Sequence, residues 1–150
     1  MKHAIALAVE NARRGRGGPF GAVIVHHGEI IAEGTNQVTG TLDPTAHAEI
    51  VAIREACRRL GHFELRDCAI YTSCEPCPMC LGGIYWSRIG SLYFACTRND
   101  AAEAGFDDGF IYDQIPLAPG ERELPTESMM REEGLSAFLE WSESPVKVPY

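Results

Sequence analysis

Lysine is scarce in this sequence: only Lys2 and Lys147 occur among 13 basic residues, against 21 acidic ones, and the formal net charge is −8. Proteins that follow a phosphate backbone usually carry a stripe of basic side chains. The best candidate for such a stripe is Arg54, Arg58 and Arg59, and a solvated helix face explains these three equally well. The composition therefore disfavours tight binding of nucleic acid.

Long apolar runs are also missing. No stretch of 18 apolar residues occurs, so no membrane-spanning helix is expected. The N-terminal segment MKHAIALAVENARR has apolar residues at helical spacing and no cleavage site of a secretory signal. We therefore expect a cytoplasmic location with reduced thiols. At 150 residues, without an internal repeat or a linker, residues 1–150 are expected to form a single domain.

The apolar pattern predicts alternating helices and strands. Helices are expected at residues 2–14, 43–60 and 76–86, with shorter helical segments in RNDAAEAG and at about 126–142. Four segments are expected to be strands: FGAVIVHH, EIIAEGTN, CAIYTS and IGSLYFAC. A loop is expected through GFDDGFIYDQIP. This order predicts an α/β fold, a three-layer α/β/α sandwich with a central mixed sheet of about five strands.

Three of the six cysteines lie within the ten residues YTSCEPCPMC, at Cys74, Cys77 and Cys80. This spacing admits a disulfide, an iron–sulfur cluster, a redox pair or a metal site. A cluster would need a fourth cysteine, and none follows closely. Cys77 and Cys80 are three residues apart, so they project from one face of the expected helix, whose N-terminus favours thiolates.

A second motif, HAE, lies upstream and contains His47 and Glu49. One imidazole and two thiolates would supply the three protein ligands of a catalytic zinc site and leave the fourth position to water. Glu49 would then carry protons to and from that water. The combination H-x-E with P-C-x-x-C is the known signature of zinc nucleobase deaminases. A closed structural site that used Cys74 as a fourth ligand would leave Glu49 without a role.

The segments PFGAVIV, DPTAHAEIVAIREAC and YTSCEPCPMCLGGIYWSRI, within about residues 19–96, resemble the cytidine and cytosine deaminase superfamily, which includes tRNA adenosine deaminases. The next stretch, DAAEAGFDDGFIYDQI, resembles the bacterial guanine deaminases, and the similarity weakens from about 114 to 140. The resemblance implies a cytidine deaminase-like fold, one Zn²⁺ per subunit and hydrolysis of guanine to xanthine and ammonia. A tRNA adenosine deaminase, another nucleobase deaminase and a structural zinc module are the alternatives.

The resemblance also implies a role for each site residue. His47, Cys77 and Cys80 would hold zinc, Glu49 would be catalytic, and Asp108 would contact the guanine edge and assist proton transfer. The implied substrate contacts are Phe20, Asn36, Ala48, Phe106, Asp108 and Tyr150. From the residues alone, Asn36 equally suits a turn, the two phenylalanines suit a core, and Asp108 suits a solvated turn. An acceptor-only carboxylate nevertheless matches the N–H donors of guanine.

The C-terminal arm, residues 144–150, would normally fray. Pro145 and Pro149 stiffen it, and it ends in an aromatic residue, Tyr150. The resemblance implies a homodimer with exchanged C-terminal arms. We therefore expect Tyr150 to cover the pocket of the partner subunit.

Overall fold

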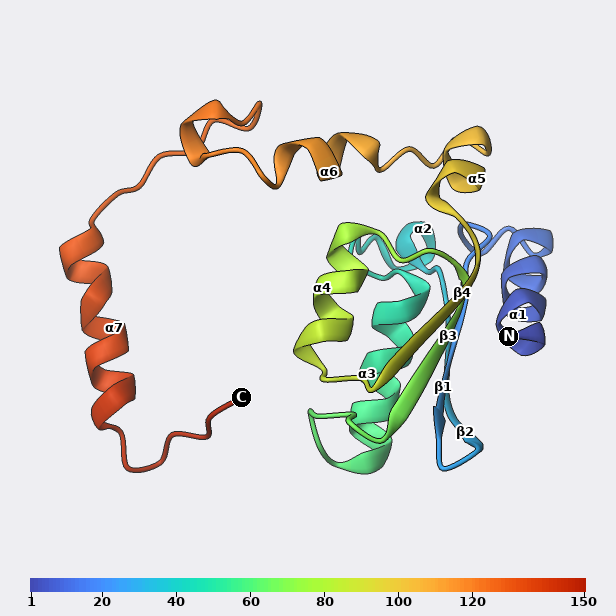
Figure 1. Ribbon diagram of the computed structural model, residues 1–150, viewed down its shortest axis with the longest axis horizontal. Helices are drawn as coiled ribbons and strands as arrows, with labels where there is room; N and C mark the ends of the chain where they lie inside the picture. Colours follow the sequence, from blue (N-terminus) through green and yellow to red (C-terminus); the bar gives the residue numbers. More distant parts are fainter. The chain divides into compact units, whose positions relative to one another are not determined.

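The structure is a computed structural model that describes residues 1–150. The chain divides into two compact units, Met1–Tyr112 and Asp113–Tyr150. The first unit contains a sheet with helices on both faces (Figure 1). The second contains one longer helix and irregular segments.

The sheet of the first unit has four strands: β1 (Gly21–His26), β2 (Glu29–Thr35), β3 (Cys68–Cys74) and β4 (Ser91–Cys96). Their order is β2-β1-β3-β4. Strand β1 is antiparallel to both neighbours, and β3 is parallel to β4. The mixed sheet is thus confirmed, whereas the expectation of about five strands is wrong. The chain after β4 turns directly into a helix whose N-cap, Thr97, is hydrogen-bonded in a capping box.

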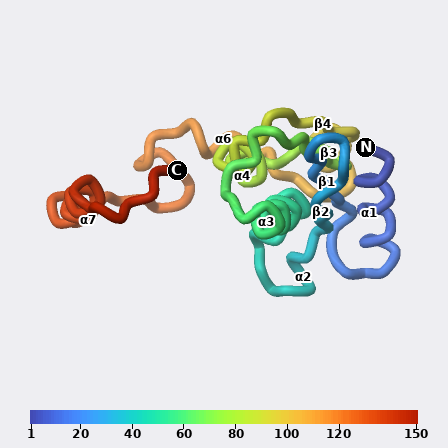
Figure 2. The backbone as a smooth tube through the Cα atoms, turned by 90° about the horizontal axis from the view of Figure 1, so that it is seen from below, coloured from blue at the N-terminus to red at the C-terminus, as the bar shows by residue number.

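Helices cover the two faces of this sheet unequally. Helix α1 (Lys2–Arg13) packs on one face, and α3 (Ala48–Leu60) lies on the other together with α4 (Pro78–Trp86) (Figures 1 and 2). The face of α3 against the sheet consists of small residues that are almost completely buried, namely Ala48, Ala52 and Ala56. A side chain at Gly34 of β2 would clash with the carbonyl oxygen of Ala48. The start of α3 therefore lies directly on the sheet.

The remaining elements are short, apart from the last helix. They are α2 (Val38–Thr41), α5 (Arg98–Glu103), α6 (Gly109–Gln114), the 3-10 turn η1 (Pro119–Glu121) and α7 (Arg131–Glu143). The loop expected through residues 105–116 is partly wrong, because residues 109–114 form α6. No helix has the length and apolar character needed to cross a membrane.

Candidate active site

Two of the predicted metal ligands are N-cap residues of neighbouring helices. His47 precedes α3 and Cys77 precedes α4, and both have extended backbone angles. Neither side chain forms a capping hydrogen bond with its own helix, so the imidazole and the thiol are available to each other. Cys80 follows in the first turn of α4 and is completely buried.

The three ligand atoms are close together. Nδ1 of His47 lies 3.5 Å from Sγ of Cys77 and 3.5 Å from Sγ of Cys80, and the three atoms lie within 4.8 Å of one another. Nitrogen and sulfur ligands of a tetrahedral zinc ion are separated by about 3.5 Å, given the usual Zn–N and Zn–S bond lengths. One nitrogen and two sulfur donors also suit zinc, and they leave a fourth position open. The cluster therefore fits a zinc ion.

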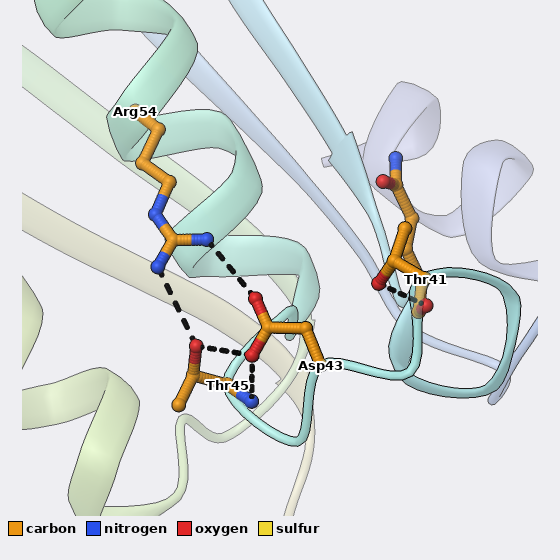
Figure 3. Close-up of polar contacts among 5 residues, drawn as sticks. Thr41, Asp43, Thr45 and Arg54 are labelled. Atoms are coloured by element: carbon orange, nitrogen blue, oxygen red, sulfur yellow. Dashed lines mark hydrogen bonds and ion pairs between the residues drawn. The ribbon is translucent and has the colours of Figure 1, made fainter.

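The loop that precedes His47 is hydrogen-bonded to helix α3, which follows it (Figure 3). Asp43 Oδ1 accepts hydrogen bonds from the backbone N–H of Thr45 at 2.8 Å and from its hydroxyl at 2.7 Å. Arg54 of α3 donates to Asp43 at 3.5 Å and to Thr45 at 3.4 Å. The hydrogen bonds from Thr45 hold the pKa of Asp43 below its usual value. The approach of the chain to His47 is thereby restrained.

Arg58 and Arg59, like Arg54, have partners within the protein. Arg58 forms an ion pair with Glu55 at 2.6 Å, and Arg59 donates to the carbonyl of Ile31 at 3.1 Å. The three arginines therefore make contacts within the protein and do not form an unpaired basic stripe.

The ligand cluster favours a thiolate at Cys77. Hydrogen bonds from the Cys80 thiol and from the His47 imidazole lower the pKa of Cys77 to about 4, although burial opposes this. The hydrogen bond to Cys77 and burial raise the pKa of Cys80. The hydrogen bond with Cys77 likewise raises the pKa of His47. A bound divalent cation would deprotonate both thiols.

Glu49 lies in the first turn of α3 and is 8% exposed. Burial raises the pKa of its carboxyl, and the negative charge of Cys77 adds to the rise. The carboxyl lines the same pocket as His47 and Cys77. A buried carboxyl with a raised pKa is suited to exchange protons with a ligand.

The pocket next to the cluster has a volume of about 340 Å³. It is formed by the ends of strands and by the segment after β4. Its lining residues are Phe20, Asn36, His47, Glu49, Cys74, Glu75, Cys77, Arg98, Ala101, Gly105, Phe106, Asp107 and Asp108. The predicted residues Phe20, Asn36, Glu49, Phe106 and Asp108 are thus brought together with two of the ligands.

Asn36 is oriented by the protein around it. Its Oδ1 accepts hydrogen bonds from the backbone N–H groups of Gly18 at 3.2 Å and Val38 at 3.3 Å. The side-chain carbonyl is therefore occupied, and the amide NH₂ is the part that remains for a ligand. Asn36 has both the turn role and the pocket position that its sequence context suggested.

Asn11 is a supporting residue that the sequence reasoning missed. It is buried in α1, and its Nδ2 donates to the carbonyls of Gly18 and Asn36, each at 2.9 Å. It thus joins two loops that border the pocket. Its helical spacing could have revealed it in the sequence, because Asn11 lies on the same inner face of α1 as the buried Ala4 and Ala8.

The two predicted aromatic contacts face each other. The rings of Phe20 and Phe106 have centroids 5.0 Å apart and planes at 84°, an edge-to-face pair. Both line the pocket. They provide an apolar wall for a planar ligand.

Asp107 and Asp108 differ in their hydrogen bonding. Asp107 Oδ1 accepts a bond from the backbone N–H of Gly109 at 2.9 Å and so makes the local turn. The Asp108 carboxyl is half-buried in the pocket wall, and its hydrogen bond in the protein is with its own backbone N–H, not with another residue. Burial raises the pKa of Asp108. Asp108 is therefore the carboxylate that is available to a ligand.

Three further residues complete the comparison with the sequence. The Cys74 thiol lines the pocket and donates to the Thr97 carbonyl at 3.4 Å, and burial raises its pKa to about 11. Ala48 is buried against the sheet and does not line the pocket. Tyr150 belongs to the second unit and is exposed. Substrate contacts of Ala48 and Tyr150 stay predictions.

Comparison with known proteins gives a consistent set of relatives. The model for the zinc-binding region of cytidine and deoxycytidylate deaminases matches residues 1–96. A curated guanine deaminase of Bacillus subtilis is 56% identical over 141 residues, which cover 94% of this chain and 90% of that protein. A tRNA-specific adenosine deaminase of Aquifex aeolicus is 49% identical over 77 residues, 51% of each protein.

Solved structures show the same similarity. The X-ray structure of guanine deaminase from Bacillus subtilis matches with a TM-score of 0.97 and 54% identity, over 99% of this chain and 95% of that chain. A structure of guanine deaminase from Nitrosomonas europaea matches with a TM-score of 0.67 and 34% identity, over 72% of this chain and 63% of that one.

Proposed function

The chain belongs to the zinc-binding cytidine and deoxycytidylate deaminase family, and on this basis we propose that it is a guanine deaminase that converts guanine and water to xanthine and ammonia. One observation carries the proposal: a single pocket joins the metal-ligand cluster, the buried Glu49 and the carboxylate of Asp108, which no other residue pairs with. The similarity to a guanine deaminase over almost the whole chain supports it.

His47, Cys77 and Cys80 hold one zinc ion in this proposal, because their geometry and donor atoms fit it. Zinc supplies a nucleophile derived from water at neutral pH. Cys74 is excluded from the ligand set, since its thiol is hydrogen-bonded to Thr97 and has a pKa of about 11.

Glu49 moves the protons. It accepts the proton that the attacking water gives up and delivers it to N3 of guanine, beside the reacting carbon. After the oxygen has added to C2, Glu49 takes the proton of the new C2 hydroxyl group and passes it to the 2-amino group, which leaves as ammonia while the C2 carbonyl of xanthine forms. General acid–base help of this kind contributes about 10²–10⁴-fold to the rate. Burial of Glu49 supports the assignment, because burial raises its pKa.

The remaining pocket residues orient the purine. Phe20 and Phe106 flank the ring, the amide NH₂ of Asn36 donates to a ring acceptor, and Asp108 accepts from the N–H edge of guanine. Asp108 also assists proton transfer. Adenine has no proton on its N1 atom, so it does not offer this edge to a carboxylate. The acidic net charge of −8 also favours a free base over a polyanionic RNA.

The functional form is a homodimer with exchanged C-terminal arms, in which residues 144–150 extend from the catalytic domain. Two sets of exposed apolar side chains support a dimer. Helix α7 exposes Phe138 and Leu139, and β4 exposes Tyr93 and Phe94. In the dimer, α7 and the arm of one subunit cover apolar surface of the other, and Tyr150 closes the partner's pocket.

The free thiols at all six cysteines suit the reducing cytoplasm.

The test is incubation of the purified, zinc-loaded protein with guanine, adenine, cytosine and an RNA stem-loop that contains adenosine. We expect stoichiometric xanthine and ammonia from guanine and little product from the other three. Deamination of adenosine in the RNA without formation of xanthine from guanine would overturn the substrate assignment. A protein that binds zinc but deaminates none of the four would instead indicate a structural zinc module.

A further inference from the structure

Arg98 is the only lysine or arginine that lines the pocket, and it lies among four acidic residues there: Glu49, Glu75, Asp107 and Asp108. A guanidinium in such surroundings would be expected to pair with a carboxylate. No ion pair of Arg98 is formed. The side chain is therefore held in another way, and its hydrogen-bond donors are not used by the protein.

Two contacts position Arg98. Its backbone N–H donates to the carboxylate of Glu75 at 3.0 Å, and its guanidinium carbon lies 4.7 Å from the ring centroid of Tyr112. The Tyr112 hydroxyl donates in turn to the carbonyl of Pro76 at 3.3 Å, next to Cys77. A cation–π contact uses the flat face of the guanidinium. The N–H groups along its edge thus remain available to a ligand.

Asp108 has the complementary character. Its carboxylate has no hydrogen-bond donor from another residue, only its own backbone N–H, whereas the Asp107 carboxylate is bound to the N–H of Gly109. The positive charge of Arg98 acts on the Asp108 carboxyl and opposes the rise in pKa that burial causes. The pocket therefore presents a donor-only group and an acceptor-only group whose charges influence each other.

We propose that Arg98 is a specificity-determining residue that donates hydrogen bonds to the 6-keto oxygen of guanine, while Asp108 accepts the neighbouring N1–H. The inference rests on the proposed function. Guanine carries this N–H and this carbonyl side by side, next to the reacting carbon C2. Adenine has an amino group in place of the keto oxygen and no proton on N1. In cytosine the ring nitrogen beside the reacting carbon is likewise unprotonated.

The geometry explains why arginine is suited to this position. A guanidinium is permanently charged and cannot accept a hydrogen bond. It therefore binds a keto oxygen and rejects an exocyclic amino group, which presents only protons in the ring plane. Guanidinium contacts with guanine O6 are the commonest base-specific contacts in protein–DNA complexes. A site built to hydrogen-bond a polar group discriminates strongly against an analogue that lacks it.

The test measures ligand binding in a zinc-loaded Glu49→Gln background, so that guanine is not consumed during calorimetry. We expect Arg98→Gln to weaken guanine binding by about 10- to 100-fold, the size expected for a lost charge-assisted hydrogen bond. Arg98→Lys should give an intermediate loss. Binding of 2-aminopurine, which keeps the 2-amino group but lacks the keto oxygen and the N1 proton, should change little.

Arg88→Gln is the matched control. The Arg88 guanidinium also lies over an aromatic ring, 5.8 Å from the centroid of Trp86, and Arg88 does not line the pocket. This variant should bind guanine as the parent does. Thermal unfolding and zinc analysis of each variant should show an unchanged midpoint and about one zinc per chain.

A second measurement reports on the keto oxygen itself. The infrared C6=O stretch of bound guanine, identified with a ¹³C label at C6, should move to higher frequency in Arg98→Gln because a strong donor is lost. This band decides the question if 2-aminopurine binds too weakly to measure. Unchanged guanine affinity in Arg98→Gln would overturn the inference. So would equal losses for guanine and 2-aminopurine, or a carbonyl band that does not move.

The two proposals fail in different ways. If the wild-type protein makes no xanthine from guanine, the proposed function itself is wrong. If the wild type makes xanthine while Arg98→Gln binds guanine normally, only the role of Arg98 is wrong.

Discussion

His47 and Cys77 occupy N-cap positions, where helices usually carry Ser, Thr, Asp or Asn. Neither side chain caps its helix, and the loss of a capping bond costs about 1 kcal/mol in a typical helix. At these two positions the chain thus gives up local helix stability for a metal site.

Zinc content distinguishes the cysteines residue by residue. Cys77→Ser should lose the metal, because one of only three ligands is removed, although serine is a good N-cap. Cys74→Ser is the matched control and should keep about one zinc per chain, since the Cys74 thiol is hydrogen-bonded to the Thr97 carbonyl and lies outside the ligand cluster. Metal analysis of the purified variants measures this. Equal loss of zinc in both variants would contradict the ligand assignment.

Glu49 can be separated from the ligands by a substitution that preserves its shape. Glu49→Gln should retain zinc and the native fold and should lower kcat for guanine by about 10³-fold or more, because both proton transfers depend on the carboxylate. Steady-state kinetics and metal analysis on the same preparation provide the measurement. Guanine turnover near the wild-type rate would rule out Glu49 as the proton carrier.

At the scale of elements, the site depends on how the sheet brings distant segments together. The alanine face of α3 and the absence of a side chain at Gly34 let the helix start lie directly against β2. The N-termini of α3 and α4 then converge on one face of the sheet (Figure 1). On the other side of the pocket, α1 supports two loops through Asn11. The pocket is therefore a junction of elements from both faces of the sheet.

Asn11 tests this junction. Asn11→Ala leaves the buried carbonyls of Gly18 and Asn36 without their donor, which should lower the free energy of unfolding by about 1–3 kcal/mol. It should also raise KM for guanine, because Gly18 and Asn36 border the pocket. Urea denaturation and steady-state kinetics measure the two effects, with Asn99→Ala, an exposed asparagine, as the control. A variant as stable as the control would show that the two hydrogen bonds contribute nothing.

At the scale of the whole molecule, the proposed exchange of C-terminal arms accounts for apolar surface on the second unit. Exposed apolar side chains on α7 and at the end of the chain, including Phe138, Leu139, Val146 and Tyr150, are unusual for an isolated subunit. Burial of these side chains would contribute to association, because apolar surface removed from water stabilises a complex by about 25 cal/mol per Å². An arm that covers the partner's pocket would also exclude water during the reaction.

Subunit mixing tests exchange of the arm. One inactive protein carries Glu49→Ala with an intact arm, and the other keeps Glu49 but lacks residues 145–150. A mixed dimer has one site with both Glu49 and a donated arm, so activity should return in the mixture. Native mass spectrometry confirms that mixed dimers form. Their formation without recovered activity would refute exchange in trans, and full activity of the truncated protein alone would remove any catalytic role of the arm.

The chemistry of the site was readable from the sequence, because its essential groups lie in two local motifs. HAE places Glu49 two residues after a histidine ligand, and PCPMC places two thiols three residues apart at the start of a helix. Local spacing also predicted the hairpin, α1, α3 and α4. The four segments expected to be strands match β1 to β4, and the fifth strand of the expected sandwich had no segment of its own in the sequence.

Only the tertiary structure decided which polar groups are left free for a ligand. The sequence could not show that Asp107 makes the turn while no other residue pairs with Asp108, that Asn36 presents its NH₂, or that Asn11 supports it. Nor could it place Arg98 over Tyr112 in the same pocket. The reason is physical: the chemical type of a side chain is local information, whereas its hydrogen-bond partners and burial depend on residues that are distant along the chain.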